Sequence, residues 1–423
     1  MLDTRIHTRD TPDRMNNFIY FVGKPYPLPE ALVACRKMGY SIGIFQDINI
    51  PLKNPGNFDK IIPVNFASTE TILASIQAQH ITVSGLVCTY ENYIVAKSII
   101  AKHFNVPAQS IESARMCTDK YLMRQAFMDK DRSITPNFGL VSSHEELLDL
   151  AATLSYPLIL KPTNLVKSML VLKCSDEKEL IDNYTYAKER IIELYKEYKI
   201  YDRVPQLIVE EYVTGKTCSI AAFIDAEGIP HYCEGIVDLV NAQDLHIDDN
   251  FIYARNLPAH FSPELTNKLY TAATKGIEAL DMRSTPAHVE LIYNDSEVKL
   301  IEIGSRIGGY RPRMYNIGYG MDLITQEINL ARGHTPYTAG TFKSYCSVFE
   351  LFPEREGRYV SIEGMDISSE VSYYSVKAKP GSRVGPAKNG HKACAVIIVA
   401  SDDKNTYESL CSKVNALKVT TES

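Results

Sequence analysis

A predicted hairpin with one acidic residue on each strand constrains this chain more than any other stretch. Residues 287–313 read AHVELIYNDSEVKLIEIGSRIGGYRPR, and two apolar, alternating runs flank Asn294 and Asp295, which favour a turn. In an antiparallel hairpin of this length, Glu290 and Glu302 lie near each other across the ladder and can share a face. The segment therefore predicts two neighbouring carboxylates on one sheet.

Two carboxylates side by side repel each other unless a cation lies between them. Oxygen ligands with no thiolate nearby suit Mg²⁺ or Mn²⁺. Arg306, Arg311 and Arg313 follow directly and are interleaved with glycines. Guanidinium groups beside a divalent cation indicate an anionic substrate, phosphate or carboxylate. On this stretch alone, an ordinary exposed hairpin with solvated charges is an equally good interpretation.

Length and composition indicate a multidomain globular protein. A chain of 423 residues is too long for one ordinary core, so we expect two or three domains. The net charge of -6 gives no electrostatic reason to expect nucleic acid as a partner. No apolar run approaches the roughly 18 residues that span a bilayer, so no membrane association is expected.

The cellular compartment is predicted from the N-terminus and the cysteines. Residues 1–16 are polar and mixed in charge, which predicts a loose, flexible tail rather than a secretory signal. The nine cysteines are scattered and form no Cys-x-x-Cys pair. This pattern argues against structural zinc and against a disulfide framework, and it predicts a cytoplasmic protein.

The first part of the chain alternates predicted strands with predicted helices. Such alternation is typical of a parallel sheet with helical crossovers. We assign residues 17–112 to a small, doubly wound α/β domain. Next, Thr118 or Asp119 can cap a helix that runs to Asp129. Lys120 lies in its first turn, which is unfavourable for the helix dipole and hints at an anion nearby; a solvated surface lysine is the alternative.

Two further stretches are each predicted to be strand, loop and strand. Lys161 ends the first strand of YPLILKPTNLVKSMLVLKC, and the loop Thr163–Ser168 offers amides, hydroxyls and an ammonium group that can close over phosphates. Glu210 and Glu211 end the first strand of VPQLIVEEYVTGKTCSIAAFID. The second stretch is either a hinge whose backbone pairs with a flat base or a solvated strand edge.

The order of these motifs resembles the ATP-grasp superfamily of carboxylate-amine ligases. Five motifs carry the resemblance over roughly residues 17–400: Lys120, Lys161 with its loop, EEYVTG, HVE and EIGSRIGG. The chain looks most like bacterial L-amino-acid ligases that form dipeptides, and it is more distantly similar to carboxylases and D-alanine-D-alanine ligases. The implied fold is a multidomain α/β and α+β one. Its expected parts after the N-terminal parallel-sheet domain are a small lobe (113–213, flap 163–168), a large lobe with the metal site (214–340) and a C-terminal β-rich lid (341–423).

The resemblance implies a nucleotide site for ATP. Lys120 and Lys161 would hold the phosphates, and the loop Thr163–Ser168 would be a mobile flap that brings Lys167 or Ser168 to the terminal phosphates. In the hinge that contains Glu210, the main-chain carbonyl of Glu211 and the amide of Val213 would read the adenine edge.

The resemblance also implies roles for residues of the acidic hairpin and the loop after it. Glu290 and Glu302 would hold Mg²⁺, and Arg306 would stabilise an acyl phosphate. Backbone amides of Gly308 and Gly309 would face the acid substrate, with Tyr310 and Arg311 lining its pocket.

The chain departs from the family pattern at three places. Gly304 stands where many members have a metal-binding asparagine, Thr217 stands where many have a ribose-binding glutamate, and the flap lacks glycine. These departures bear on activity, nucleotide preference and the number of metal ions.

The expected activity is ATP-dependent joining of a small carboxylate to a small amine, with an acyl phosphate as intermediate and ADP and phosphate as products. An amino acid is expected as one substrate at least, and a homodimer is common among the proteins that the chain resembles. The alternative is a nucleotide-binding regulatory or degenerate ATP-grasp protein without ligase turnover. A third interpretation, carboxylation or thioester formation on the same scaffold, ranks lower because no biotin or CoA handle is visible.

Overall fold

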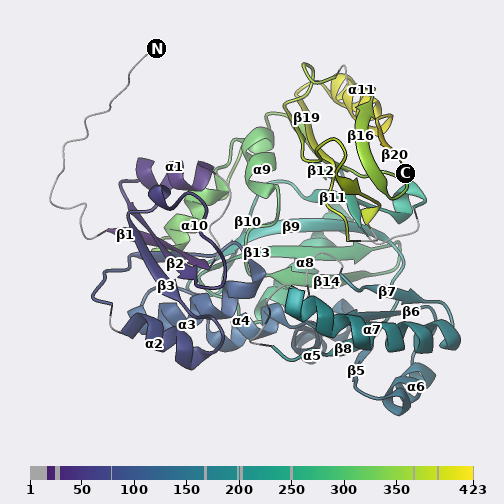
Figure 1. The fold of residues 1–423 in the computed structure, drawn as a ribbon, viewed down its shortest axis with the longest axis horizontal. Helices are drawn as coiled ribbons and strands as arrows, with labels where there is room; N and C mark the ends of the chain where they lie inside the picture. Colours follow the sequence, from purple (N-terminus) through teal and green to yellow (C-terminus); the bar gives the residue numbers. More distant parts are fainter. Residues whose placement is uncertain are drawn as a thin grey trace.

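The computed structural model describes residues 17–23, 29–77, 79–165, 169–197, 200, 203–247, 251–364, 367–387 and 390–422. The expected tail at 1–16 and two predicted site residues, Lys167 and Ser168, lie outside these ranges. The strands of the described residues form four sheets, with the N-terminal part on one side, the small lobe below and the C-terminal part above (Figure 1). Among the described residues, no helix combines the length and apolar character that crossing a membrane requires.

The N-terminal part is a parallel sheet with helices on both faces, as the alternation of elements predicted. The strand order is β3-β2-β1-β4, and every pairing is parallel. Five consecutive residues of β1 are buried because both faces are covered. The elements are β1 (Phe18–Gly23), α1 (Pro29–Lys37), β2 (Ser41–Asp47), β3 (Lys60–Val64), α2 (Thr69–Gln77), β4 (Gly85–Val87) and α3 (Ile94–Phe104).

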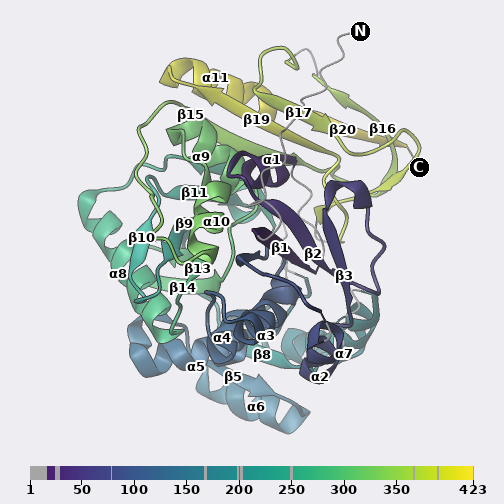
Figure 2. The same ribbon diagram turned by 90° about the vertical axis from the view of Figure 1, so that its left-hand side faces the viewer.

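Alternate residues of β1 reach opposite faces of this sheet. Tyr20 and Val22 pack with α2 and α3, whereas Ile19 and Phe21 pack with α1 and with α10 (Leu323–Ala331), a helix from much later in the chain. Figure 2 shows α10 beside the N-terminal strands. The N-terminal sheet therefore shares a core with the C-terminal half of the chain.

The small lobe is an antiparallel sheet of order β5-β8-β6-β7. The longest described helix, α7, covers it with a stripe of buried side chains at helical spacing: Leu180, Tyr184, Ala187, Ile191 and Leu194. The elements of this part are α4 (Ile111–Thr118), α5 (Lys120–Lys130), β5 (Phe138–Val141), α6 (His144–Thr153), β6 (Leu158–Pro162), β7 (Leu172–Cys174), α7 (Glu177–Glu197) and β8 (Leu207–Glu211).

The large sheet runs in the order β14-β13-β9-β11-β12-β15-β19-β17, with β10 paired to β9. Its hairpin of β13 and β14 packs on α8, which in turn packs on α5. The elements up to α10 are β9 (Lys216–Ile224), β10 (Pro230–Tyr232), β11 (Val237–Asn241), β12 (Ile252–Leu257), α8 (Pro263–Ala279), β13 (Thr285–Tyr293), β14 (Val298–Gly304) and α9 (Arg311–Tyr319).

The residues expected to form a separate C-terminal lid divide between two sheets. β15 pairs with β12, so strands from both sides of the boundary expected near residue 340 belong to the same large sheet. β19 and β17 extend this large sheet further, and the other three strands form the sheet β18-β16-β20, which packs near α11 (Figure 1). These elements are β15 (Tyr345–Leu351), β16 (Gly357–Glu363), β17 (Tyr373–Val376), β18 (Arg383–Val384), β19 (Ala395–Ser401), α11 (Lys404–Asn415) and β20 (Lys418–Glu422).

Candidate active site

The acidic hairpin forms as the sequence predicted. Glu290 of β13 pairs directly opposite Glu302 of β14, and Asn294 organises the turn by accepting hydrogen bonds from the amides of Ser296 and Glu297. The register shifts just after Glu290, which marks a β-bulge at the acidic pair. The predicted pairing of the two carboxylates across the ladder is confirmed.

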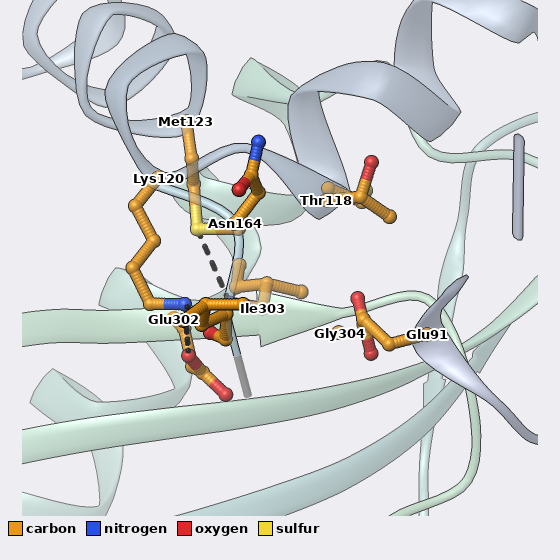
Figure 3. A pocket seen from close by; sticks show the side chains of 10 residues that line it. Glu91, Thr118, Lys120, Met123, Asn164, Glu302, Ile303 and Gly304 are labelled. Carbon is orange, nitrogen blue, oxygen red and sulfur yellow. Dashed lines mark hydrogen bonds and ion pairs between the residues drawn. The ribbon is translucent and has the colours of Figure 1, made fainter. Parts of the chain in front are cut away.

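Lys120 reaches this hairpin from α5. Asp119 caps the helix by accepting from the amides of Tyr121 and Leu122, which fixes the first turn. The Lys120 ammonium lies 3.4 Å from Glu302 Oε2 and donates to the carbonyl oxygen of Leu165 at 2.9 Å. Figure 3 shows the Lys120 and Glu302 side chains pointing toward each other.

A small cavity, open to solvent, lies between the N-terminal part, α5, the flap loop and the hairpin. Lys120 and Glu302 line one side of it, and Glu91 lines the other beside Gly304 (Figure 3). The remaining lining residues are Cys117, Thr118, Met123, Asn164, Leu165 and Ile303. The flap loop and the hairpin, which are far apart in sequence, therefore line the same cavity.

Lys161 belongs to a buried ionic cluster behind this cavity. Its ammonium lies 2.7 Å from Glu210 Oε2, and Arg124 Nε donates to Glu210 Oε1 at 2.9 Å. Arg124 Nη2 also donates to the carbonyl of Ile301, at 2.8 Å, in the strand that carries Glu302. The cluster thus connects β6 and β8 of the small lobe to the acidic hairpin.

Both members of the Lys161–Glu210 pair are ionised at neutral pH. Burial lowers the pKa of Lys161 to about 8, since desolvation and the charges of Arg124 and Lys120 outweigh the attraction of Glu210. Burial alone would raise the pKa of Glu210, but the charges of Arg124 and Lys161 lower it to about 2. The Glu210 side chain, which is 4% exposed, therefore forms internal ion pairs and does not face the cavity.

The other two residues of the expected hinge lie at the end of β8. The Glu211 carboxylate accepts hydrogen bonds from the amide and the side chain of Asn137, and Val213 is partly buried. The chain just after β8 is bound to the large sheet, since Asn294 Nδ2 of the hairpin turn donates to the Thr214 carbonyl at 2.8 Å.

Arg306 is held in place by Glu91. Arg306 Nε donates to Glu91 Oε2 at 3.0 Å, and Nη1 donates to the carbonyl of Ile307 at 3.2 Å. Burial lowers the pKa of the guanidinium, but the charges of Glu91, Glu302 and Glu290 outweigh it and leave that pKa raised. Arg306 therefore lies in the field of three carboxylates.

His288 orients Glu290 from the same strand. Burial lowers the pKa of His288, and its Nε2 forms a hydrogen bond with Glu290 Oε1 at 3.0 Å. Burial opposes the charge of Glu290, but this hydrogen bond and the guanidinium groups of Arg311 and Arg306 lower its pKa to about 2. Glu290 is thus an oriented, ionised carboxylate.

The residues expected to bind the acid substrate lie on the loop between β14 and α9. Arg311 is 2% exposed, and its Nη2 donates to Ser219 Oγ at 2.7 Å in the strand next to Glu290. Tyr310 adopts a left-handed φ of 62°, and its hydroxyl donates to Glu350 Oε1 at 3.0 Å. A side chain at Gly309 would meet open space, whereas one at Gly308 would strike His288 Nδ1 at 2.6 Å.

Comparison with known proteins agrees with this geometry. Residues 154–312 match the ATP-grasp domain family. This part of the chain is therefore similar to ATP-grasp domains. Over 97% of its length the structure superimposes on all of an L-amino acid ligase from Bacillus licheniformis, with a TM-score of 0.78 and 17% sequence identity. The ATP-grasp fold and the likeness to L-amino-acid ligases, both expected from the sequence, are confirmed.

The sequence relatives of this chain are distant. An uncharacterized protein, y4rH, of Sinorhizobium fredii is 22% identical over 317 residues, which are 73% of this chain and 61% of that protein. The alanine–anticapsin ligase of Bacillus subtilis is 21% identical over 325 residues, which are 73% of this chain and 67% of that ligase. The chain thus spans less than two thirds of the first of these relatives.

The residues of this site fit a divalent cation. Glu290 and Glu302 present carboxylate oxygens from two directly paired strand residues, and the buried Oδ1 of Asn164, on the same cavity as Glu302, has no hydrogen-bond partner among the described residues. Among the described residues no group of three or more His, Cys, Asp or Glu side chains comes close enough to hold an ion. Two carboxylates, with phosphate and water oxygens, are the coordination that Mg²⁺ accepts.

Sequence reasoning missed three residues of the site: Glu91, Arg124 and Asn164. Glu91 follows β4 at the carboxyl end of a parallel strand, where ligand-binding residues gather in open α/β sheets, so its position carried a signal. Arg124 lies one turn after Lys120 on α5, next to the buried Met123 and Phe127. Asn164 lies in the loop Thr163–Ser168 that the sequence predicted as the flap, but its own burial depends on the contact of this loop with α5.

Proposed function

We propose that this chain is an ATP-dependent ligase that joins a small carboxylate, an amino acid in particular, to an amine. The observation that carries the proposal is the meeting of Lys120 with Glu302 at 3.4 Å, directly beside Glu290, on a cavity that the flap loop also lines. A lysine beside paired carboxylates suits a polyphosphate bound with Mg²⁺. The names of the L-amino acid ligase and the alanine–anticapsin ligase support an amino acid as the acid.

The reaction begins when an oxygen of the substrate carboxylate attacks the terminal phosphorus of ATP. This step forms an acyl phosphate and releases ADP. The amine then attacks the acyl carbon, the C–N bond forms, the C–O bond to phosphate breaks, and the amine loses its proton. Mg²⁺, when bound by Glu290 and Glu302, neutralises the phosphate oxygens.

The side chains supply charge and exclude water. Lys120, on the cavity, and Lys161, behind it, balance the negative charge of the phosphates. Arg306 stabilises the negative charge that develops on the transferring phosphoryl group and the acyl oxygen. The flap loop, whose Leu165 carbonyl already accepts from Lys120, closes over the acyl phosphate and keeps water away from it.

The test is phosphate release from ATP and Mg²⁺ in the presence of pools of amino acids. We expect ADP and phosphate as products, together with a new amide detected by mass spectrometry. Glu302→Gln should lower the rate by about 10²-fold or more, because it removes a charge from the cation site. Glu297→Gln is the matched control, since the side chain of this partly exposed residue of the same hairpin forms an ion pair with Lys299 at 3.2 Å and lies off the cavity.

Each contrary result has a defined meaning. AMP as the nucleotide product would contradict the acyl-phosphate route. Tight MgADP binding without phosphate release on any pool would favour the nucleotide-binding regulatory alternative. Unchanged turnover in Glu302→Gln would remove that residue from the cation site.

A further inference from the structure

Glu91 lies where three parts of the chain meet. It begins the short 3₁₀ turn Glu91–Tyr93 after β4, at the carboxyl edge of the N-terminal sheet. Its side chain is 13% exposed and pairs with Arg306 of the ATP-grasp domain. Its main-chain oxygen accepts a long hydrogen bond, 3.4 Å, from Arg203 Nη2, just before β8 of the small lobe. One residue of the N-terminal part thus contacts both lobes.

The Glu91 carboxylate fixes the direction of the Arg306 guanidinium. Nε is bound to Glu91 Oε2 and Nη1 to the Ile307 carbonyl, so the plane of the group is set by contacts at two of its three nitrogens. The third, Nη2, makes no hydrogen bond to any residue in the described part of the chain. This nitrogen is therefore left for a bound anion.

Gly304 makes room for this contact. A Cβ at residue 304 would lie 3.4 Å from Glu91 Oε2, which is ordinary contact distance, so the carboxylate lies directly against the position that a side chain at residue 304 would leave from. Figure 3 shows the Glu91 side chain directly beside Gly304. The absence of a side chain at residue 304 therefore leaves space for the Glu91 carboxylate where it contacts Arg306.

We propose that Glu91 is a positioning residue that aims Arg306 at the reacting phosphoryl and acyl groups, and that Gly304 is required for this contact. The proposal rests on the proposed ligase function. It also makes the N-terminal domain part of the reaction, because Glu91 is correctly placed only when that domain and both lobes are assembled. Misdirecting a charged donor by about 1 Å can lower a rate by about 10²-fold without weakening nucleotide binding.

The kinetic test compares Glu91→Gln and Glu91→Ala in the full chain, using the amino acid that gives phosphate release. We expect kcat to fall about tenfold in Glu91→Gln, which keeps an acceptor oxygen, and about 10²-fold in Glu91→Ala, with KM for ATP within about threefold of the parent. Glu30→Gln is the matched control, because it breaks another ion pair between the N-terminal part and α9, 3.2 Å to Arg313, away from the cavity. Parent-like kcat in Glu91→Ala, or a loss confined to KM for ATP, would overturn the proposal.

A second measurement needs no substrate. In a protein labelled with ¹⁵N-arginine, the Arg306 Nε–H resonance is assigned by its loss in Arg306→Lys. We expect it to shift or broaden in Glu91→Gln and Glu91→Ala and to stay in place in Glu30→Gln. Gly304→Val should have the same effect as Glu91→Ala although it changes no charge. An unmoved resonance in all three site variants would refute the positioning contact.

The two measurements separate the two hypotheses. If the parent chain releases no phosphate with any amino acid, the ligase proposal fails, while the resonance still decides whether Glu91 holds Arg306. If the parent turns over and the resonance does not respond to Glu91 or Gly304, the ligase proposal stands and the positioning role is wrong.

Discussion

At the scale of single residues, Lys161 gives the sharpest prediction about the nucleotide site. Its pKa is lowered to about 8, so near pH 8 about half of the free protein carries a neutral amine there. A bound phosphate favours the charged form and raises this pKa, so MgADP binding should take up protons near pH 8 and almost none at pH 6.5. Calorimetry in two buffers of different ionisation enthalpy measures the uptake. Lys161→Arg, which stays charged, should bind MgADP without proton uptake. If the heat of MgADP binding to the parent does not depend on the buffer, the bound phosphates do not change the protonation of Lys161.

At the scale of elements, the loop after β14 depends on close packing against β13. A Cβ at Gly308 would lie 2.6 Å from His288 Nδ1 and 2.9 Å from Arg311 Cγ, and both of those side chains are buried. Gly308→Ala should therefore cost about 1–3 kcal/mol of unfolding free energy and displace His288 from Glu290. Urea unfolding measures the first effect and Mn²⁺ titration the second. Gly309→Ala, at a position open to solvent, is the comparison for stability, and equal stability of the two variants would contradict the packing argument.

The same hairpin shows what the sequence could predict and what it could not. Period-two alternation and an Asn-Asp turn place Glu290 opposite Glu302, because register along a short hairpin is a local property. The Glu91–Arg306 pair joins residues 215 positions apart, and the Arg124–Glu210 pair joins residues 86 apart. No local pattern specifies such contacts, since they follow from how the sheets are stacked. The two expected flap residues, Lys167 and Ser168, lie outside the described residues, so their roles stay predictions.

At the scale of the whole molecule, α10 binds the N-terminal sheet to the ATP-grasp domain. Ile324 and Ile328 of this helix pack in the same core as Ile19 and Phe21 of β1. Glu327, on the same helix, is 3% exposed, and its Oε1 has no hydrogen-bond partner. A buried, incompletely paired carboxyl at a shared core makes the joint between the two parts sensitive to pH.

The direction of that pH dependence follows from the environment of Glu327. Burial raises its pKa to about 7, and the charge of Lys97 only partly offsets the effect. Because the folded pKa lies above the unfolded one, the contribution of Glu327 to stability is fully present below pH 4.5 and is lost as pH rises through 7, by up to about 3 kcal/mol.

Glu327→Gln removes the titrating group. The free energy of unfolding of this variant, measured in urea, should therefore rise relative to that of the parent between pH 5 and pH 8. Circular dichroism and tyrosine fluorescence, suited to a chain without tryptophan, should report one coincident transition, because the shared core couples the two parts. A constant difference between the Glu327→Gln variant and the parent across this range would show that Glu327 does not titrate, and two separate transitions would show that α10 does not join the domains.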